Sequence, residues 1–132
     1  MITSTSNAQI KELAKLQKKS RLRDEKGIFL VEGPRMTEEI PAERIEKVYA
    51  SESFAKKNKE FLEKLQAPVE LLTDTVFAYV SDTKTPQGIL AIVKRLNYMM
   101  NDLMQVKNQK APHLVVLDNL QDPGNLGTIF RT

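Results

Sequence analysis

The chain lacks cysteine entirely, which excludes disulfide bonds and thiolate metal sites and fits a reducing compartment. It has a single histidine, His113, so neither a zinc site nor a histidine-based catalytic site is expected. No apolar run approaches the roughly 20 residues that a membrane-spanning helix needs. The N-terminus also lacks the apolar region of a secretory signal peptide. Together these absences favour a cytoplasmic protein without a metal.

The composition, 41% hydrophobic and 28% charged residues, is typical of a globular protein, but the charge is unevenly distributed. Residues 1–26 contain seven bases and three acids, a net charge of +4, so the other 106 residues contribute −1 to the total of +3. The excess is concentrated around Lys18, Lys19, Arg21 and Arg23. A nucleic-acid contact and a solvated helix face both produce such a concentration, and charge alone does not separate them.

Helical and extended patterns alternate along the first 95 residues. Apolar spacing predicts four helices, at 7–19, 35–40, 52–65 and 74–80. Short apolar segments predict four strands, at 28–31, 45–49, 69–72 and 89–93, of which the first and the last are continuous apolar runs. Three of the helices have polar side chains suited to cap their first turn, namely Ser6 (with Gln9 in a capping box), Ser51 and Thr73. This alternation indicates an α/β domain with helices on both faces of a small sheet.

The sequence changes character after residue 95. Residues 96–112 are polar and read as a connector, in which Leu96, Met99, Met100 and Leu103 keep the spacing of a short amphipathic helix. An apolar run at 114–117 then predicts a buried strand, followed by a polar turn at 122–125 and a helix over 126–130. Such a strand, Gly-rich turn and helix start can form a site for an anionic or nucleotide-like ligand. The alternative is an ordinary connection in which Asn125 caps a helix.

The C-terminal segment Asn125-Leu126-Gly127-Thr128-Ile129-Phe130-Arg131 follows a hydrophobic run that ends in Asp118. It resembles the first signature, Asn-x-Gly-x-x-x-Arg, of the SpoU branch of the SPOUT RNA methyltransferases. The N-terminal half resembles that family's substrate-binding domain in four features: Ser6-Asn7 before a helix, the basic run Lys18 to Arg23, the segment Gly27 to Gly33, and Thr85-Pro86-Gln87-Gly88 before the last strand. The resemblance covers essentially the whole chain.

The resemblance implies a fold and a division into domains. Residues 1–95 would form an RNA substrate-binding domain, a three-layer α/β/α sandwich like certain RNA-binding ribosomal proteins. Residues 96–112 would be a linker, and 113–132 the truncated first β-α unit of an α/β-knot methyltransferase domain. The family's second and third signatures supply most of its cofactor pocket and knot, and neither occurs here. The chain is therefore expected to be an inactive fragment without cofactor-binding residues, which retains mainly RNA binding.

The resemblance also implies a reaction and partners. S-adenosylmethionine would give its methyl group to a ribose 2′-hydroxyl of RNA, either ribosomal RNA, which is preferred, or transfer RNA. The full-length protein would be a homodimer. Arg131 would hold an RNA phosphate bidentately rather than act as a base, and Asn125 would orient the arginine or the ribose. Further RNA contacts are predicted for five side chains: Lys18, Lys19, Arg21, Arg23 and Gln87.

Two other functions are compatible with parts of the sequence. A non-catalytic, ribosomal-protein-like RNA-binding module would be complete near residue 95, and the predicted strand at 114–117 argues against it. The phosphate loop of another nucleotide-binding enzyme would have Lys-Ser or Lys-Thr after its glycines, whereas Gly127 is followed by Thr128-Ile129. The RNA methyltransferase hypothesis is therefore preferred, and the gene beyond codon 132 would test it.

Overall fold

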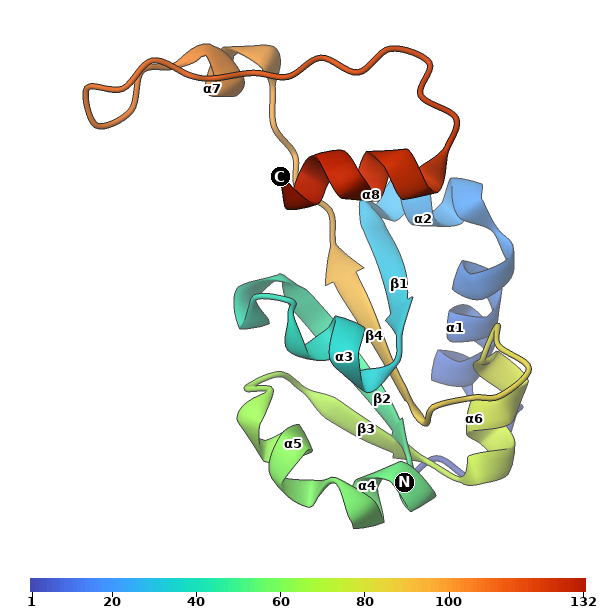
Figure 1. The fold of residues 1–132 in the computed structure, drawn as a ribbon. Helices are drawn as coiled ribbons and strands as arrows, with labels where there is room; N and C mark the ends of the chain where they lie inside the picture. The colour runs from blue at the N-terminus through green and yellow to red at the C-terminus, as the bar shows by residue number, and fades with distance from the viewer. The chain divides into compact units, whose positions relative to one another are not determined.

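Four strands form one mixed sheet in the first part of the chain, in the order β1-β4-β2-β3 (Figure 1). The computed structural model describes all 132 residues, in two compact units, Met1–Leu96 and Asn97–Thr132. The sheet belongs to the first unit, and its strands are β1 (Ile28–Glu32), β2 (Ile45–Ser51), β3 (Val69–Leu72) and β4 (Ile89–Lys94). The prediction of a mixed α/β fold with four strands is confirmed.

The pairing directions bring three strand ends to one edge of the sheet. Strand β4 runs antiparallel to both β1 and β2, whereas β2 and β3 are parallel. Strands β1, β2 and β3 therefore point the same way. Their carboxyl ends lie at the edge where β4 begins, and loops that follow them can meet there.

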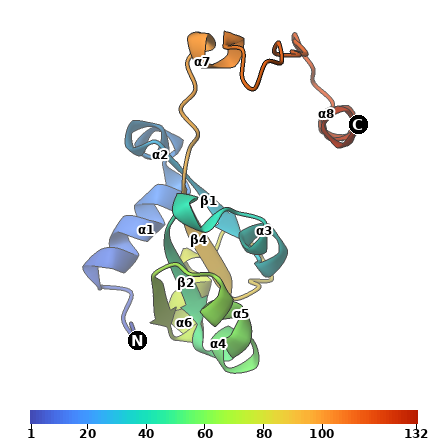
Figure 2. The same ribbon diagram turned by 90° about the vertical axis from the view of Figure 1, so that its left-hand side faces the viewer.

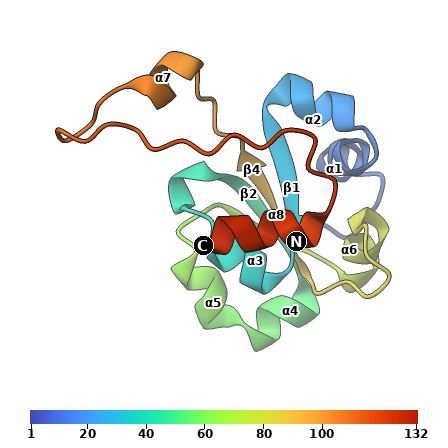
Figure 3. The ribbon, with the colours of Figure 1, turned by 45° about the horizontal axis from the view of Figure 1, so that its top comes forward.

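Helices cover both faces of this sheet. Helices α1 (Ala8–Lys18) and α6 (Asp74–Val80) pack on one face, where their apolar side chains join Leu90 and Ile92 in a single cluster. Further helices of the unit lie on the other side (Figures 2 and 3). They are α3 (Pro34–Glu38), α4 (Glu52–Lys57) and α5 (Lys59–Lys64). Alternate residues of β4 enter a second cluster on that side, which is why its apolar sequence is uninterrupted.

Two of the three predicted helix caps are confirmed. The Ser51 hydroxyl accepts a hydrogen bond from the backbone N–H of Phe54 at 3.2 Å, and Thr73 caps α6 in the same way. The prediction for Ser6 is wrong by one residue. Asn7 caps α1 instead, and its side-chain oxygen accepts from the N–H of Gln9 at 2.9 Å. Because the Asn7 oxygen already accepts from a first-turn N–H, the helix does not need Ser6 as its cap.

Two predicted helices differ from the observed ones. The helix expected over 52–65 is broken at Asn58 (φ −129°, ψ 41°), whose side-chain amide donates to the Phe54 carbonyl and ends α4. The basic run after α1 forms a helix of its own, α2 (Ser20–Lys26), which begins after an extended Lys19. Gly27 ends α2 in the left-handed conformation (φ 63°) that a glycine adopts without steric cost.

The second unit contains two helices, α7 (Met100–Met104) and α8 (Pro123–Arg131), and none of its residues is buried. The predicted strand at 114–117 is wrong: these residues pair with no strand, and their side chains are 40–88% exposed. An apolar run becomes a buried strand only beside a hydrogen-bonding neighbour, and this unit supplies none. The turn predicted at 122–125 is also wrong, since Asp122 caps α8 and Pro123 is its first residue.

The longest helix, α1, has 11 residues, and the chain has no helix with the length and apolarity of a membrane span. No group of three or more metal-ligating side chains comes together.

Candidate functional site

The basic run lies at the edge of the sheet where β1 begins. Lys18 ends α1, Lys19 joins it to α2, and both side chains are exposed. The Arg21 side chain is 92% exposed and forms a salt bridge with Glu25 at 3.2 Å, one helical turn later. Three of the four predicted basic contacts are therefore on the surface, and two of them have no protein partner.

Arg23 differs from its neighbours because its guanidinium is bonded to the end of α1. It donates hydrogen bonds to the carbonyl oxygens of Leu16 and Gln17, the latter at 2.9 Å, and it is partly buried. These carbonyls belong to the last turn of the helix, where acceptors lack an intrahelical donor and a cation is favoured. Arg23 thus stabilises the α1–α2 junction.

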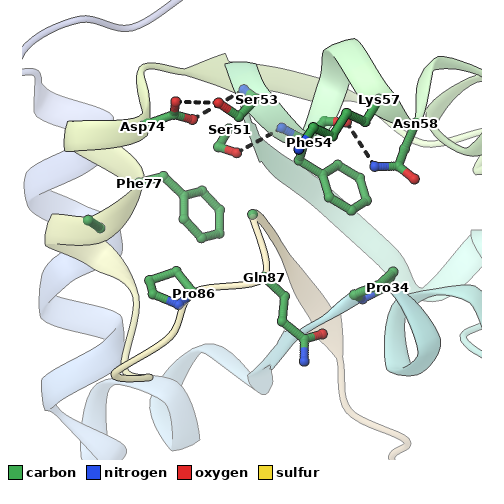
Figure 4. A pocket seen from close by; sticks show the side chains of 12 residues that line it. Pro34, Ser51, Ser53, Phe54, Lys57, Asn58, Asp74, Phe77, Pro86 and Gln87 are labelled. Carbon is green, nitrogen blue, oxygen red and sulfur yellow. Dashed lines mark hydrogen bonds between the residues drawn. The ribbon is translucent and has the colours of Figure 1, made fainter.

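Gln87 lies at the opposite edge of the sheet, where β1 ends and β4 begins. Its side chain sits so close to Gly33 that a Cβ atom there would be 2.7 Å from the Gln87 Oε1. Gln87 lines a cleft of about 710 Å³. Figure 4 shows Pro34 beside it. The cleft is formed by the segments that follow β1, β2 and β3, as the strand directions require.

The cleft combines apolar walls with a fixed carboxylate. Phe54 and Phe77, both buried, line it together with a hydrogen-bonded pair, Ser53 and Asp74 (Figure 4). The Ser53 hydroxyl and backbone N–H both donate to the Asp74 carboxylate, the latter at 3.1 Å. These two hydrogen bonds, the hydroxyl's first, hold the pKa of Asp74 below its ordinary value. Asp74 is therefore ionised near neutral pH, and its contact with Ser53 joins the first turns of α4 and α6.

The loop that carries Gln87 is held by Glu32, the last residue of β1. The Glu32 carboxylate accepts hydrogen bonds from the Ser81 hydroxyl, from the Thr83 hydroxyl at 3.2 Å and from the Asp82 N–H at 3.3 Å. Three donors on one carboxylate fix the path of the chain after α6. Besides the Asp74 carboxylate, the cleft offers the side-chain amides of Asn58 and Gln87 and one cation, Lys57.

The basic run and Gln87 are not brought together. Gly27 and Gly33 flank the five residues of β1, and at roughly 3.3 Å per residue these glycines are about 20 Å apart. An RNA that touched both groups would have to extend along the length of the sheet. The first unit therefore has two separate candidate surfaces rather than one compact site.

Asn125 and Arg131 both lie on α8, in the second unit, and both are exposed. They are six residues apart, so about 120° separates their directions around a helix of 3.6 residues per turn. The Arg131 guanidinium folds back over the helix: its Nη1 would lie 3.1 Å from a Cβ atom on Gly127, and its Nη2 is 3.5 Å from the Thr128 hydroxyl. Gly127 therefore provides the space that the arginine occupies.

The family described as the MRM3-like substrate binding domain matches residues 7–91, which is more than half of the chain. The chain belongs to this family. The matched range contains the whole four-stranded sheet except the last three residues of β4, together with both candidate surfaces of the first unit.

Two named relatives extend the comparison beyond this family's domain. The chain is 31% identical over 134 residues to the 23S rRNA (guanosine(2553)-2′-O)-methyltransferase RlmP of Bacillus subtilis (strain 168), with 99% of the chain and 49% of that protein covered. It is 33% identical over 125 residues to the Homo sapiens protein named rRNA methyltransferase 3, mitochondrial, with 86% and 28% covered. The chain thus spans half or less of the length of the relatives it matches.

Solved structures show the same fold. A crystal structure of an RNA 2′-O ribose methyltransferase matches 98% of the chain and 50% of its own, with a TM-score of 0.66 and 29% identity. An AdoMet-bound rRNA methyltransferase from Sinorhizobium meliloti matches 81% and 41%, with a TM-score of 0.60. At 17% identity, the second likeness is one of fold.

Some residues at these surfaces were missed by the sequence analysis. Lys15 and Lys11 lie one and two turns before Lys18 on α1, and their spacing of three and four residues was available in the sequence. Tyr79 lies beside them, but it comes from α6, and only the packing of the two helices reveals it. The contact of Glu32 with residues 81–83 also joins segments that are distant in the sequence.

Proposed function

We propose that this chain is the RNA-binding part, together with the beginning of the catalytic domain, of an RNA methyltransferase that acts on ribosomal RNA. Such an enzyme transfers the methyl group of S-adenosylmethionine to a ribose 2′-hydroxyl. The observation that carries the proposal is the likeness, along 98% of the chain, to a solved RNA 2′-O ribose methyltransferase. The name of the Bacillus subtilis relative, a 23S rRNA 2′-O-methyltransferase, supports ribosomal RNA as the substrate.

The proposal divides the chain at its change of character near residue 96. Residues 1–95 are the substrate-binding domain, a three-layer α/β/α sandwich of the kind found in RNA-binding ribosomal proteins. Two hydrophobic clusters on opposite faces of the sheet support this description. Residues 96–112 are the linker, and 113–132 begin the α/β-knot domain. Segment 114–117 would become a strand there, once sheet neighbours satisfy its backbone.

In the catalytic domain, Arg131 and Asn125 would act on different parts of one nucleotide. Arg131 is effectively never deprotonated, so its guanidinium would hold the phosphate bidentately rather than take a proton. The Asn125 amide would orient the ribose, whose 2′-hydroxyl is a poor nucleophile unless it is held in line. Their different directions around α8 fit this division of roles.

In the substrate-binding domain, RNA contacts are proposed at both edges of the sheet. Lys18, Lys19 and Arg21 are exposed and available to phosphates. Arg23 is bonded to the end of α1, so only the part of its guanidinium that stays exposed can contribute. Gln87 would contact RNA at the other edge, from the loop that Glu32 holds in place.

We propose that most of the cofactor pocket is formed by parts of the whole enzyme other than this chain. No residue of 97–132 is buried, and segment 114–117 has no sheet around it. S-adenosylmethionine would therefore be held by parts of the enzyme outside this chain, and the 132 residues alone would be inactive. The proposal also includes a cytoplasmic location and a homodimer of the whole enzyme.

The test is methyl transfer by the whole product of the gene that contains this chain. The enzyme is incubated with S-adenosylmethionine labelled in its methyl group and with ribosomal RNA that lacks modifications. The RNA is then digested to nucleosides and analysed by mass spectrometry. The expected product is a 2′-O-methyl nucleoside, and Arg131→Ala should lower its rate of formation.

A base-methylated nucleoside, or no product with either ribosomal or transfer RNA, would overturn the proposal. The isolated 132-residue chain serves as the matched control. It is expected to bind RNA and to form no product.

A further inference from the structure

A shallow groove runs between α1 and α6 on the outer surface of the first unit. Its volume is about 250 Å³, and its lining consists of Lys11, Ala14, Lys15, Lys18, Lys19 and Tyr79. We call it the α1–α6 groove. It is separate from the cleft beside Gln87, with which it shares no lining residue.

The groove is positively charged without compensation. Four of its six lining residues are lysines, none is acidic, and none of the four lysines forms a salt bridge. The Glu12 carboxylate feels the charge of Lys15, but it is paired with Lys26 at 2.8 Å. A surface of this kind attracts a polyanion.

A second lysine cluster provides a contrast. Helices α4 and α5 place Lys56, Lys57, Lys59 and Lys64 around another surface depression, but Glu38 and Glu60 line it as well. Its charges are mixed, as on an ordinary solvated helix face. Both depressions are lined by four lysines, so the α1–α6 groove differs from this one in having no acidic side chain.

The lysines of the groove follow a line rather than surround a point. Lys11, Lys15 and Lys18 are spaced by four and three residues, so they share one face of α1. At 1.5 Å per residue the line from Lys11 to Lys18 is about 10 Å long. Such a line fits successive phosphates of a strand better than a single small anion.

Tyr79 adds an aromatic surface to this line of charge. Its neighbours Val76, Phe77 and Val80 are buried and hold α6 against the sheet, whereas Tyr79 is 54% exposed. The ring therefore stands at the surface beside the lysines. An exposed aromatic ring in a basic groove is the combination by which proteins bind single-stranded nucleic acid, because any unpaired base can stack on it.

We propose that the α1–α6 groove binds a single-stranded segment of the RNA substrate. Tyr79 stacks on an unpaired base, while Lys11, Lys15, Lys18 and Lys19 hold the neighbouring phosphates. The choice of RNA rests on the proposed function, and the choice of an unpaired segment rests on Tyr79. Arg21 and Arg23 lie outside this set, since neither lines the groove.

The test measures binding of the 132-residue chain to two fluorescein-labelled RNAs, a mixed-sequence single strand and the matching duplex. Fluorescence anisotropy is recorded over a series of NaCl concentrations. The charge variant is Lys11→Gln, Lys15→Gln and Lys18→Gln combined. Its matched control combines Lys56→Gln, Lys59→Gln and Lys64→Gln, which removes the same charge elsewhere. Tyr79→Ala and Tyr79→Phe test the ring, and circular dichroism confirms that each variant is folded.

For the single strand, the charge variant should lower the slope of log affinity against log salt by about 2, since each phosphate contact contributes about 0.7. Tyr79→Ala should weaken binding of the single strand at least about five-fold without changing that slope, whereas Tyr79→Phe should bind like the unaltered chain. Duplex binding should not respond to Tyr79→Ala. The matched control should leave the slope unchanged.

The groove assignment would be overturned if the charge variant and its control lowered the salt slope equally. It would also be overturned if Tyr79→Ala left the affinity for the single strand unchanged. Both outcomes leave RNA binding by the domain intact. An unaltered chain that binds neither RNA would overturn it as well. In that case the methyl-transfer assay still decides the proposed function independently.

Discussion

Gly33 and Gln87 are in contact across the end of β1, because a side chain at Gly33 would occupy the space that Gln87 fills. The glycine has φ 107°, in a region that is essentially restricted to glycine. Its N–H donates to the carbonyl of Ile89 at 3.0 Å, and its carbonyl accepts from the Thr37 hydroxyl at 2.8 Å. This one residue therefore joins β1, α3, β4 and the loop that carries the predicted RNA contact.

Replacing this glycine should cost stability through its backbone. Gly33→Ala is expected to lower the free energy of unfolding by about 1–3 kcal/mol, measured by urea denaturation. The contact with Gln87 involves the end of a flexible side chain, which can move aside. The double variant Gly33→Ala, Gln87→Ala should therefore be about as unstable as Gly33→Ala alone. Full recovery in the double variant would show that the side-chain clash, and not the backbone, was the cause.

Gly88 should be the more sensitive glycine of the same edge. It has φ 83°, and a Cβ atom there would lie 2.7 Å from both the Phe54 Cβ and the Ser51 hydroxyl oxygen. The Phe54 Cβ is fixed to the backbone, and the Ser51 oxygen is held as the cap of α4, so overpacking adds to the backbone strain. Gly88→Ala is expected to cost roughly 2–5 kcal/mol, measured by urea denaturation. Gly27→Ala is the control, with left-handed φ but open space around it, and an equal loss in both variants would contradict the packing argument.

Arg23 and Lys18 should separate stability from RNA binding. Arg23→Ala leaves two carbonyls of α1 without their donor, and we expect a loss of about 1–2 kcal/mol in the free energy of unfolding. Lys18→Ala should leave stability within about 0.5 kcal/mol, because the side chain is exposed and has no partner. Thermal melting and RNA titration in NaCl measure both properties. A larger effect of Arg23→Ala on the salt slope than of Lys18→Ala would reverse these roles.

Local patterns in the sequence predicted the sheet because each strand signal was complete within its own segment. The run Ile89 to Val93 is apolar throughout, since its alternate residues enter clusters on opposite faces. Thr73 and Ser51 correctly predicted two helix starts, because each cap accepts a hydrogen bond from the N–H only three residues later. Predictions failed where a nearby competing bond decided the outcome, as at Asn58, or where a partner is needed, as at 114–117.

The candidate surfaces depended on contacts between distant segments and were only partly predictable. The basic run could be identified in the sequence. That Arg23 is structural while the lysines are exposed became clear only from the hydrogen bonds at the α1–α2 junction. Gln87 was singled out from its loop. That it lies at the other end of β1 from the basic run followed only from the pairing of the strands. No sequence pattern pointed to Tyr79, because it becomes part of a basic groove only when α6 packs beside the lysines of α1.

The hydrogen bonds from Ser53 to Asp74 should stabilise the folded chain at neutral pH and lose this effect in acid. They lower the pKa of Asp74 in the folded chain, so the contribution of the carboxylate is present above the unfolded value, about pH 4, and is lost as pH falls through the folded value. Asp74→Asn should therefore unfold at a lower urea concentration than the unaltered chain at pH 7. The difference should disappear as the pH falls below about 4. Ser53→Ala removes the first of the two hydrogen bonds, so in its background Asp74→Asn should lower the urea midpoint at pH 7 by less. If Asp74→Asn lowered the midpoint equally at every pH, Asp74 would act through something other than its charge.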